Sequence, residues 1–223
     1  MWKVDQILQL FAPFECLGCR QEGNLLCHRC GLEALEPAPL SCYRCLRPAQ
    51  AAICLGCKQV APLGGVWVAT AYKGLSVQVV ARLKFSRTQA AGPLIAQLMD
   101  ARLPVTPVDT VVVHIPTAAQ RIRQRGYDQA QLIARDFARC RRLPYQALLR
   151  RRGNARQLGA GREQRRAQLS TAFYCPRPEQ LRGKRILLVD DVLTTGSTIE
   201  AAAKVCVEAG AEQVCAGLFA QKR

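Results

Sequence analysis

The chain has few aromatic residues, few histidines and few acidic residues, and it lacks long apolar runs. Aromatic residues make up 6% of its 223 residues, and the two histidines are His28 and His114. A nucleophilic cysteine needs a basic partner, so the scarcity of histidine argues against cysteine catalysis. No apolar stretch reaches the roughly 18 residues of a membrane-spanning helix, which argues against membrane insertion. The first residues lack the apolar centre and cleavage site of a signal peptide, so we expect a cytoplasmic protein.

Acidic residues are outnumbered by basic ones, 16 to 32, which gives a formal net charge of +16. The excess lies almost entirely after residue 60, and residues 121–166 alone contain 14 arginines and three acidic residues. Such a field attracts polyanions or phosphorylated small molecules. Arginine placed on solvated faces by a GC-rich genome is the alternative explanation. A hydrophobic content of 49% allows a buried core and excludes general disorder.

Eight of the 12 cysteines form four Cys-x-x-Cys pairs near the N-terminus, in a repeat with seven or eight residues between the pairs of each half. Four thiolates around one ion form the closed tetrahedral shell that structural Zn2+ prefers. Redox dithiols and iron–sulfur clusters are alternatives. We expect sequential pairing, the first pair with the second and the third with the fourth, and interleaved pairing is the alternative that stays open. We therefore predict a zinc-binding domain over 1–62 and a second domain over 63–223. The predicted zinc ligands of the first domain are Cys16, Cys19, Cys27, Cys30, Cys42, Cys45, Cys54 and Cys57.

From residue 65 onward, short apolar segments alternate with helical patterns. Strands are expected at 66–71, 110–115, 185–189 and 213–220, and helices at 76–85, 91–102, 127–140 and 198–209. Buried strands interleaved with helices are typical of an α/β fold with a mostly parallel sheet flanked by helices. Residues 144–170 show little periodicity and are expected to form a long loop.

The most informative segment runs from Ile186 to Thr198. Its apolar strand is followed by Asp190 and Asp191, then by a loop of small and hydroxyl residues that opens into a helix. Backbone N–H groups and hydroxyls at a helix N-terminus suit a phosphate, while two carboxylates suit a sugar diol or a cation. As an alternative, Ser197 and Glu200 have the spacing of a capping box, and the two acids would then be solvated loop residues.

This segment resembles the signature of type I phosphoribosyltransferases, which bind phosphoribosyl pyrophosphate (PRPP). The multi-cysteine N-terminus, the segments Tyr72–Phe85 and Arg121–Ala130, and the Asp-Asp loop together are similar to the ComF family. That family consists of phosphoribosyltransferase-like proteins linked to competence and DNA uptake or utilisation. The resemblance implies a type I phosphoribosyltransferase-like sheet behind a small cysteine-rich zinc-binding domain.

The resemblance also implies the roles of individual residues. Asp190 and Asp191 would hold the ribose hydroxyls, with Mg2+ nearby. The 5-phosphate would lie on the residues of the hydroxyl loop, which are Thr194, Thr195, Gly196, Ser197 and Thr198. Candidates for the pyrophosphate and for a catalytic loop are Pro116, Thr117, Arg121, Arg125, Gln157 and Arg166. Lys84 is a further candidate, although a solvated helix lysine explains it equally well.

Two functions follow from these residues. The first is a ComF-like protein that binds PRPP with Mg2+ and handles single-stranded DNA in competence, DNA uptake or DNA utilisation, with DNA-uptake machinery proteins as further partners. The alternative is an active phosphoribosyltransferase that acts on an unidentified nucleobase or amine in nucleotide metabolism. Because aromatic stacking platforms are scarce, we expect DNA contact to be mainly electrostatic and sensitive to salt.

Overall fold

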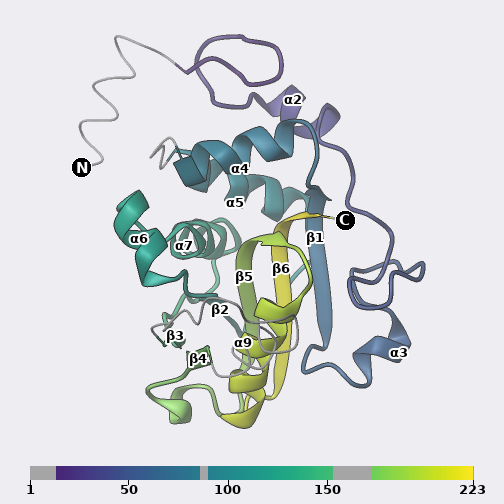
Figure 1. The fold of residues 1–223 in the computed structure, drawn as a ribbon, viewed down its shortest axis with the longest axis vertical. Coiled ribbons are helices and arrows are strands. Elements are labelled where there is room, and N and C mark those ends of the chain that lie inside the picture. Colours follow the sequence, from purple (N-terminus) through teal and green to yellow (C-terminus); the bar gives the residue numbers. More distant parts are fainter. Residues whose placement is uncertain (1–13, 86–89, 153–171, 223) are drawn as a thin grey trace, which may run out of the picture.

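A four-stranded parallel sheet forms the centre of the molecule (Figure 1). The computed structural model describes residues 14–85, 90–152 and 172–222. All three strand pairings are parallel. In spatial order the strands are β1 (Gly65–Ala71), β6 (Gln213–Gln221), β5 (Arg185–Leu193) and β2 (Thr110–His114). The predicted fold class, a mostly parallel α/β sheet, is confirmed.

The helices follow the predicted order, with bounds shifted by one or two residues. They are α4 (Leu75–Phe85), α5 (Ala91–Arg102), α7 (Gln129–Arg141) and α9 (Ser197–Glu208). The sequence pattern did not predict the short elements, which are α2 (His28–Glu33), α3 (Leu55–Lys58), α6 (Ala119–Arg125), the 3-10 helix η1 (Pro178–Gln180) and the antiparallel pair β3 (Arg150–Arg151) and β4 (Phe173–Tyr174). Among the described residues, no helix is both long and apolar enough to cross a membrane.

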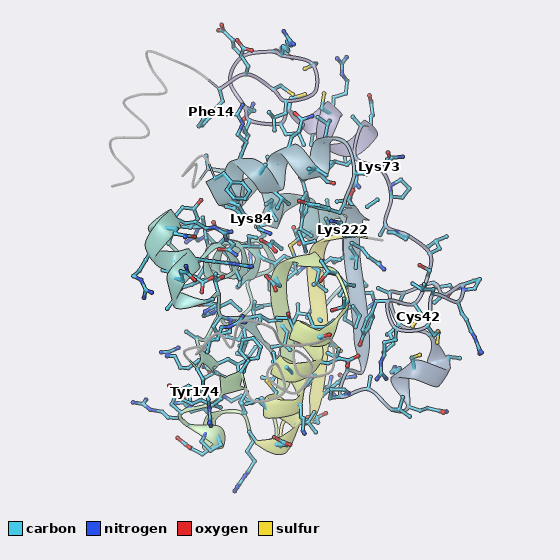
Figure 2. The ribbon with its side chains drawn as sticks, viewed as in Figure 1. Phe14, Cys42, Lys73, Lys84, Tyr174 and Lys222 are labelled. Atoms are coloured by element: carbon cyan, nitrogen blue, oxygen red, sulfur yellow. The ribbon has the colours of Figure 1, made fainter. Side chains whose placement is uncertain are left out.

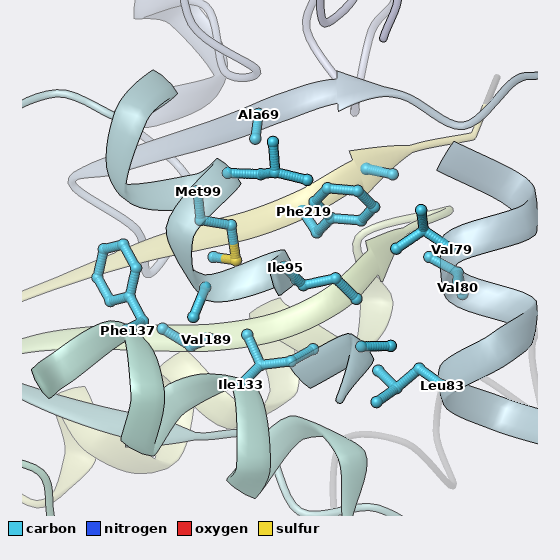
Figure 3. Close-up of a cluster of buried hydrophobic side chains, with 14 of the residues drawn as sticks. Ala69, Val79, Val80, Leu83, Ile95, Met99, Ile133, Phe137, Val189 and Phe219 are labelled. Carbon is cyan, nitrogen blue, oxygen red and sulfur yellow. The ribbon is translucent and has the colours of Figure 1, made fainter. Parts of the chain in front are cut away.

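Each face of the sheet carries its own apolar cluster. Along β5, Leu187 and Val189 belong to one cluster, and Ile186 and Leu188 belong to the other, as the alternation of side chains along a strand requires. Burial on both faces explains why β5 reads as a continuous apolar run. The first cluster joins the sheet to α4, α5 and α7 through Val79, Leu83, Ile95, Met99 and Phe137 (Figure 3). The second joins it to α9 and β4 through Ala202, Cys206 and Phe173.

Both edges of the sheet are covered by neighbouring backbone. At β1, Ala52 N–H donates to the Val66 carbonyl at 3.0 Å, and Ala71 N–H donates to the Glu36 carbonyl at 3.0 Å. At the other edge, Val112 exchanges hydrogen bonds with the segment just after α7. Covered edges cannot pair with a second chain, which protects a parallel sheet from edge-to-edge association.

The N-terminal region packs directly on the sheet and its flanking helices. Cys16 and Leu26 belong to the first apolar cluster, whereas Cys42 and Ile53 belong to the second. Arg102, at the end of α5, donates to the Gly31 and Leu32 carbonyls at 2.9 and 3.0 Å. The predicted boundary after residue 62 stays a prediction, and the two regions share their apolar interior.

One buried arginine joins the end of α7 to the end of α5. The Arg141 side chain is 10% exposed, and its guanidinium lies 4.8 Å from the centre of the Phe137 ring. Its Nε donates to Asp100 Oδ1 at 2.8 Å. The other two nitrogens donate to four acceptors around the α5 C-terminus, which are the Asp100, Leu103 and Pro104 carbonyls and the Thr106 hydroxyl. The Arg141 guanidinium therefore holds the loop after α5 in place.

Candidate functional site

The two predicted acids lie within β5 and not after it. The predicted strand ended at Val189, but β5 continues to Leu193, which pairs with Gln221 of β6. The extension follows from β6, whose apolar sequence supplies pairing partners up to its own end. Asp190 and Asp191 therefore lie near the C-terminal end of β5, at the carboxyl edge of the sheet, where ligands bind in open α/β folds.

The two carboxylates lie in different electrostatic surroundings: Asp191 pairs with a lysine, and Asp190 lies next to the charge of Asp191. Lys84 Nζ of α4 (labelled in Figure 2) lies 2.7 Å from Asp191 Oδ2. Both side chains are largely buried. Burial, together with the negative charge of Asp191, raises the pKa of Asp190 to about 8. Near neutral pH the Asp190 carboxyl is thus mostly protonated without a ligand, and the pair holds a proton that a cation or a hydrogen-bonding ligand can displace.

The hydroxyl loop leads into α9, where the Ser197 N–H donates a long hydrogen bond of 3.4 Å to Thr195 Oγ1 within the loop itself. Gly196 is the N-cap, with a φ of 79°, and it makes no side-chain cap hydrogen bond. Ser197 is the first helical residue, and its hydroxyl lies 3.0 Å from that of Thr195. Glu200 does not complete a capping box, because its carboxylate binds Tyr43 and Arg44. The helix N-terminus is therefore available to an anion.

The loop after β2 is held by an aspartate that the sequence analysis did not single out. Asp128 accepts hydrogen bonds from the backbone N–H and the hydroxyl of Thr117, both at 2.9 Å. It also caps α7 by accepting from the N–H groups of Ala130 and Gln131. The structure thus brings Pro116 and Thr117 to the predicted edge, but the polar atoms of Thr117 are already engaged.

Two arginines, Arg125 and Arg151, lie near the carboxylates, and Arg121 lies near both of these arginines. Arg125 is partly buried, feels the charge of Asp191, and has an Nη1 atom without a hydrogen-bond partner among the described residues. Burial lowers the pKa of Arg125. Arg151 of β3, which the sequence analysis missed, feels the charges of Asp190 and Arg121, and its Nε also lacks a described partner. Unpaired buried guanidinium nitrogens are suited to an anionic ligand. Gln157 and Arg166 lie outside the described residues.

A cavity of about 770 Å³ lies beside this edge, between α7 and the segment that leads into β3. It shares Pro116, Thr117 and Arg151 with the surroundings of the carboxylates. Its remaining charged lining is provided mainly by α7 and β3, and consists of Asp128, Arg135, Asp136, Arg139 and Arg150. We call this cavity the arginine groove. It is a continuous recess with more cationic than anionic side chains.

The eight predicted ligands form two separate clusters, which we call the first and second cysteine clusters. The sulfur atoms of each cluster lie within 4.8 Å of one another, and the pairing is sequential. The sulfur atoms of Cys19 and Cys27 lie 3.8 Å apart in the first cluster, and those of Cys45 and Cys54 lie 3.6 Å apart in the second. Four sulfurs at about 2.3 Å from a tetrahedral Zn2+ would be about 3.8 Å apart. The donor set and its spacing therefore fit a structural zinc ion in each cluster.

Comparisons with known proteins agree with this architecture. Residues 122–223 match the phosphoribosyl transferase domain family. The DNA utilization protein YhgH of Salmonella typhi is 29% identical over 197 residues, which cover 85% of this chain and 81% of that protein. The competence protein ComFC of Bacillus subtilis is 33% identical over 100 residues, 45% of this chain and 39% of that protein.

Among solved structures, the allosteric regulatory enzyme of purine biosynthesis matches with a TM-score of 0.45 and 20% identity, over 63% of this chain and 30% of that one. This chain thus spans less than a third of that enzyme. The match to the Salmonella protein, by contrast, is too long to be confined to the phosphoribosyl transferase domain. Because that likeness extends into the region of the cysteine clusters, the comparisons and the two clusters together support assignment of the chain to the ComF family of phosphoribosyltransferase-like proteins.

Proposed function

We propose that the chain binds PRPP with Mg2+ at the carboxyl edge of β5 and handles single-stranded DNA in competence or DNA utilisation. One observation carries the PRPP proposal: two adjacent carboxylates at the carboxyl end of β5 are followed by the first turn of a twelve-residue helix, whose N-cap glycine makes no side-chain cap hydrogen bond. A phosphate takes the positive end of the helix, and hydroxyl donors of a ribose take the carboxylates. Both halves of a phosphorylated pentose are thereby matched by one edge of the sheet.

The pyrophosphate of PRPP is proposed to face the arginines. Arg121, Arg125 and Arg151 provide cationic forks on the side of the β2–α6 loop, and a guanidinium matches two phosphate oxygens at once. Lys84 holds the Asp191 carboxylate in place through an ion pair of 2.7 Å. Asp190 and Asp191 are hard oxygen donors suited to Mg2+, which would neutralise the charge of the pyrophosphate as it leaves.

Calorimetric titration of the zinc-loaded protein with PRPP tests the proposal. With Mg2+ present, we expect saturable binding with one PRPP per chain. Asp190 has its pKa raised to about 8, so it is mostly protonated at pH 7 and must ionise to offer a full carboxylate to Mg2+ and the ribose hydroxyls. Binding should therefore release a proton at pH 7, and the affinity should increase from pH 6 to pH 8. A protein with bound zinc and no PRPP heat at any of these pH values would contradict the proposal.

The alternative function, phosphoribosyl transfer, is distinguished by the fate of the pyrophosphate. Release of pyrophosphate only with a particular nucleobase or amine would favour an enzyme. Stable binding of PRPP without release across a panel of acceptors would favour a binding protein. The proposed site accommodates either outcome, because holding PRPP and weakening its anomeric bond use the same cationic and metal contacts.

The arginine groove is the proposed path for single-stranded DNA. Two of the relatives are named DNA utilization protein and competence protein. The groove runs along α7, and it has arginine side chains from α7 on one wall and from β3 on the other. Phosphate contacts of this kind give affinity without sequence preference. Phe173 is buried beneath Arg151, so it offers no exposed face for a base. The groove favours recognition of the DNA backbone over recognition of its bases.

Replacing Arg135 and Arg150 together by Gln should weaken binding of single-stranded DNA. Each lost phosphate contact lowers the slope of log affinity against log salt by about 0.7, so the double variant should lose about 1.4. Fluorescence anisotropy of a labelled oligothymidine at several salt concentrations measures this slope. The control is Arg29→Gln with Arg82→Gln, two exposed arginines on α2 and α4. Equal slopes in both double variants would mean that DNA does not use the groove.

A further inference from the structure

The two cysteine clusters are built alike but carry different residues at one place. Cys16 and Cys42 occupy the same position in each repeat, and the N–H of each donates to a carbonyl five residues on, that of Gln21 or of Arg47, in both cases at 2.9 Å. The fifth residue of each knuckle, Arg20 or Leu46, has a positive φ, 62° and 61° respectively. Between the paired cysteines, however, the first knuckle has Leu-Gly and the second has Tyr-Arg. A shared scaffold thus presents two different surfaces.

Tyr43 of the second knuckle lies against the loop proposed to hold the phosphate. A Cβ atom added to Gly196 would lie 2.1 Å from Cε2 of the Tyr43 ring, so the ring covers the glycine at the α9 N-cap. Tyr43 is buried, and its hydroxyl donates to Glu200 Oε1 at 2.8 Å. One side chain therefore contacts both the N-cap and the first turn of α9.

Arg44 adds an ionic contact to the same turn of helix. Its Nε lies 2.9 Å from Glu200 Oε1, and its Nη1 donates to the Cys57 carbonyl at 3.5 Å. Arg44 thus joins α9 to the last cysteine pair of the second cluster. Neither contact is fully buried, since the Arg44 and Glu200 side chains are 31% and 28% exposed. The Tyr43 ring constrains the loop more than Arg44 does, because the ring leaves room only for glycine at position 196.

The first cysteine cluster faces a different part of the fold. A Cβ atom added to Gly18 would lie 3.3 Å from Leu75 Cδ1 of α4, and one added to Gly31 would lie 3.0 Å from Leu98 Cδ2 of α5. Arg102 of α5 binds carbonyls at the end of α2. These contacts are with helices of the first apolar cluster, on the face of the sheet that α9 does not cover.

We infer that the second cysteine cluster positions the phosphate loop, with Tyr43 as the positioning residue, whereas the first cluster does not. Metal in the second cluster fixes the Cys42–Cys45 knuckle, the knuckle fixes the Tyr43 ring, and the ring fixes Gly196 and the N–H groups that follow it. Loss of the metal, or of the ring, increases the motion of residues 194–200 and lowers the affinity for a phosphate placed there. The last step rests on the proposed function, but the effect on loop motion does not.

Hydrogen exchange of the backbone over residues 193–201 tests the inference without any ligand. Tyr43→Leu installs the residue of the first repeat and leaves all eight cysteines in place. We expect two zinc ions per chain by elemental analysis, exchange in the loop faster by about tenfold, and PRPP affinity lower by about tenfold. Tyr43→Phe keeps the ring over Gly196, so its exchange rate in the loop and its PRPP affinity should stay close to those of the wild-type protein. Leu17→Ala is the matched control at the equivalent position of the first knuckle.

The metal is tested with Cys42→Ser and Cys16→Ser. Each variant should retain one zinc, and only Cys42→Ser should accelerate exchange in the loop. Equal acceleration in both, or in Leu17→Ala, would overturn the inference, because it would indicate general loosening of the fold. Unchanged exchange in Tyr43→Leu would also overturn the inference. Because Tyr43→Leu keeps all eight cysteines, this test remains decisive if Cys42→Ser fails to fold. A wild-type protein that binds no PRPP would remove the proposed function, while the exchange results would still decide the positioning role.

Discussion

Replacement of Asp190 and Asp191 together by Asn is expected to abolish PRPP binding and to leave the fold intact. A hydrogen bond from a sugar hydroxyl to a carboxylate contributes about 1.5–3 kcal/mol, so loss of two such contacts should lower the affinity by at least about 100-fold. The fold should survive, because the substitution removes both the cost of burying the Asp190 charge and its repulsion from Asp191, which together raise the pKa of Asp190 to about 8. Calorimetry gives the affinity, and far-UV circular dichroism checks the fold.

A matched control removes the same charge elsewhere. Asp109→Asn with Glu212→Gln neutralises two exposed acids that pair with Arg185 at the opposite end of β5. The affinity for PRPP should stay within about twofold, since exposed ion pairs of this kind contribute little. Retention of wild-type affinity by the Asp190 and Asp191 double variant would refute the site. Asp191→Asn alone should also release Lys84, whose ammonium lies 2.7 Å from Oδ2, and should cause the larger loss of thermal stability of the two single variants.

Arg141→Ala is expected to cause the largest loss of stability among single arginine substitutions on α7. Its side chain is 10% exposed and donates to five acceptors around the end of α5, among them the carbonyls of Asp100 and Leu103 at 2.9 and 2.8 Å. Removal leaves these acceptors without their donor and empties a space beside Phe137. We expect the free energy of unfolding to fall by about 3 kcal/mol.

Urea unfolding of the zinc-loaded protein measures this effect. Arg135→Ala on the same helix is the control, because that side chain is exposed and its loss should change the free energy of unfolding by less than about 0.5 kcal/mol. Arg141→Met keeps the apolar stem over Phe137 and should recover only the packing part of the loss. Similar stabilities for Arg141→Ala and Arg135→Ala would mean that water replaces the guanidinium at little cost.

The parts of the fold that were predicted correctly are those with local signals. The strand at 110–115 and the helix at 91–102 have apolar patterns that do not depend on distant residues. Helix α6 was missed because its residues, Ala119–Arg125, include one large apolar side chain, so they show no apolar period. The end of β5 was misplaced because its continuation depends on pairing with β6, which the sequence of β5 does not report.

The candidate site divides in the same way. The Asp-Asp pair, the hydroxyl loop and the eight cysteines were all visible as short spacings. The sequential pairing of the cysteines was expected, but both pairings satisfy the same spacing, and only the structure decided between them. The capping-box alternative at Ser197 and Glu200 was not realised, because Glu200 binds two residues of the second knuckle instead.

The sequence by itself determined the order of the elements, the zinc-type ligands and the chemical character of the β5–α9 edge, because each of these depends on neighbours a few residues apart. Only the tertiary structure decided which charges meet there. Tyr43 and Glu200 are 157 positions apart, and Lys84 reaches Asp191 from another helix. Such contacts arise from the packing of helices on a sheet, and a buried ion pair or a ring against a glycine leaves no periodic trace along the chain.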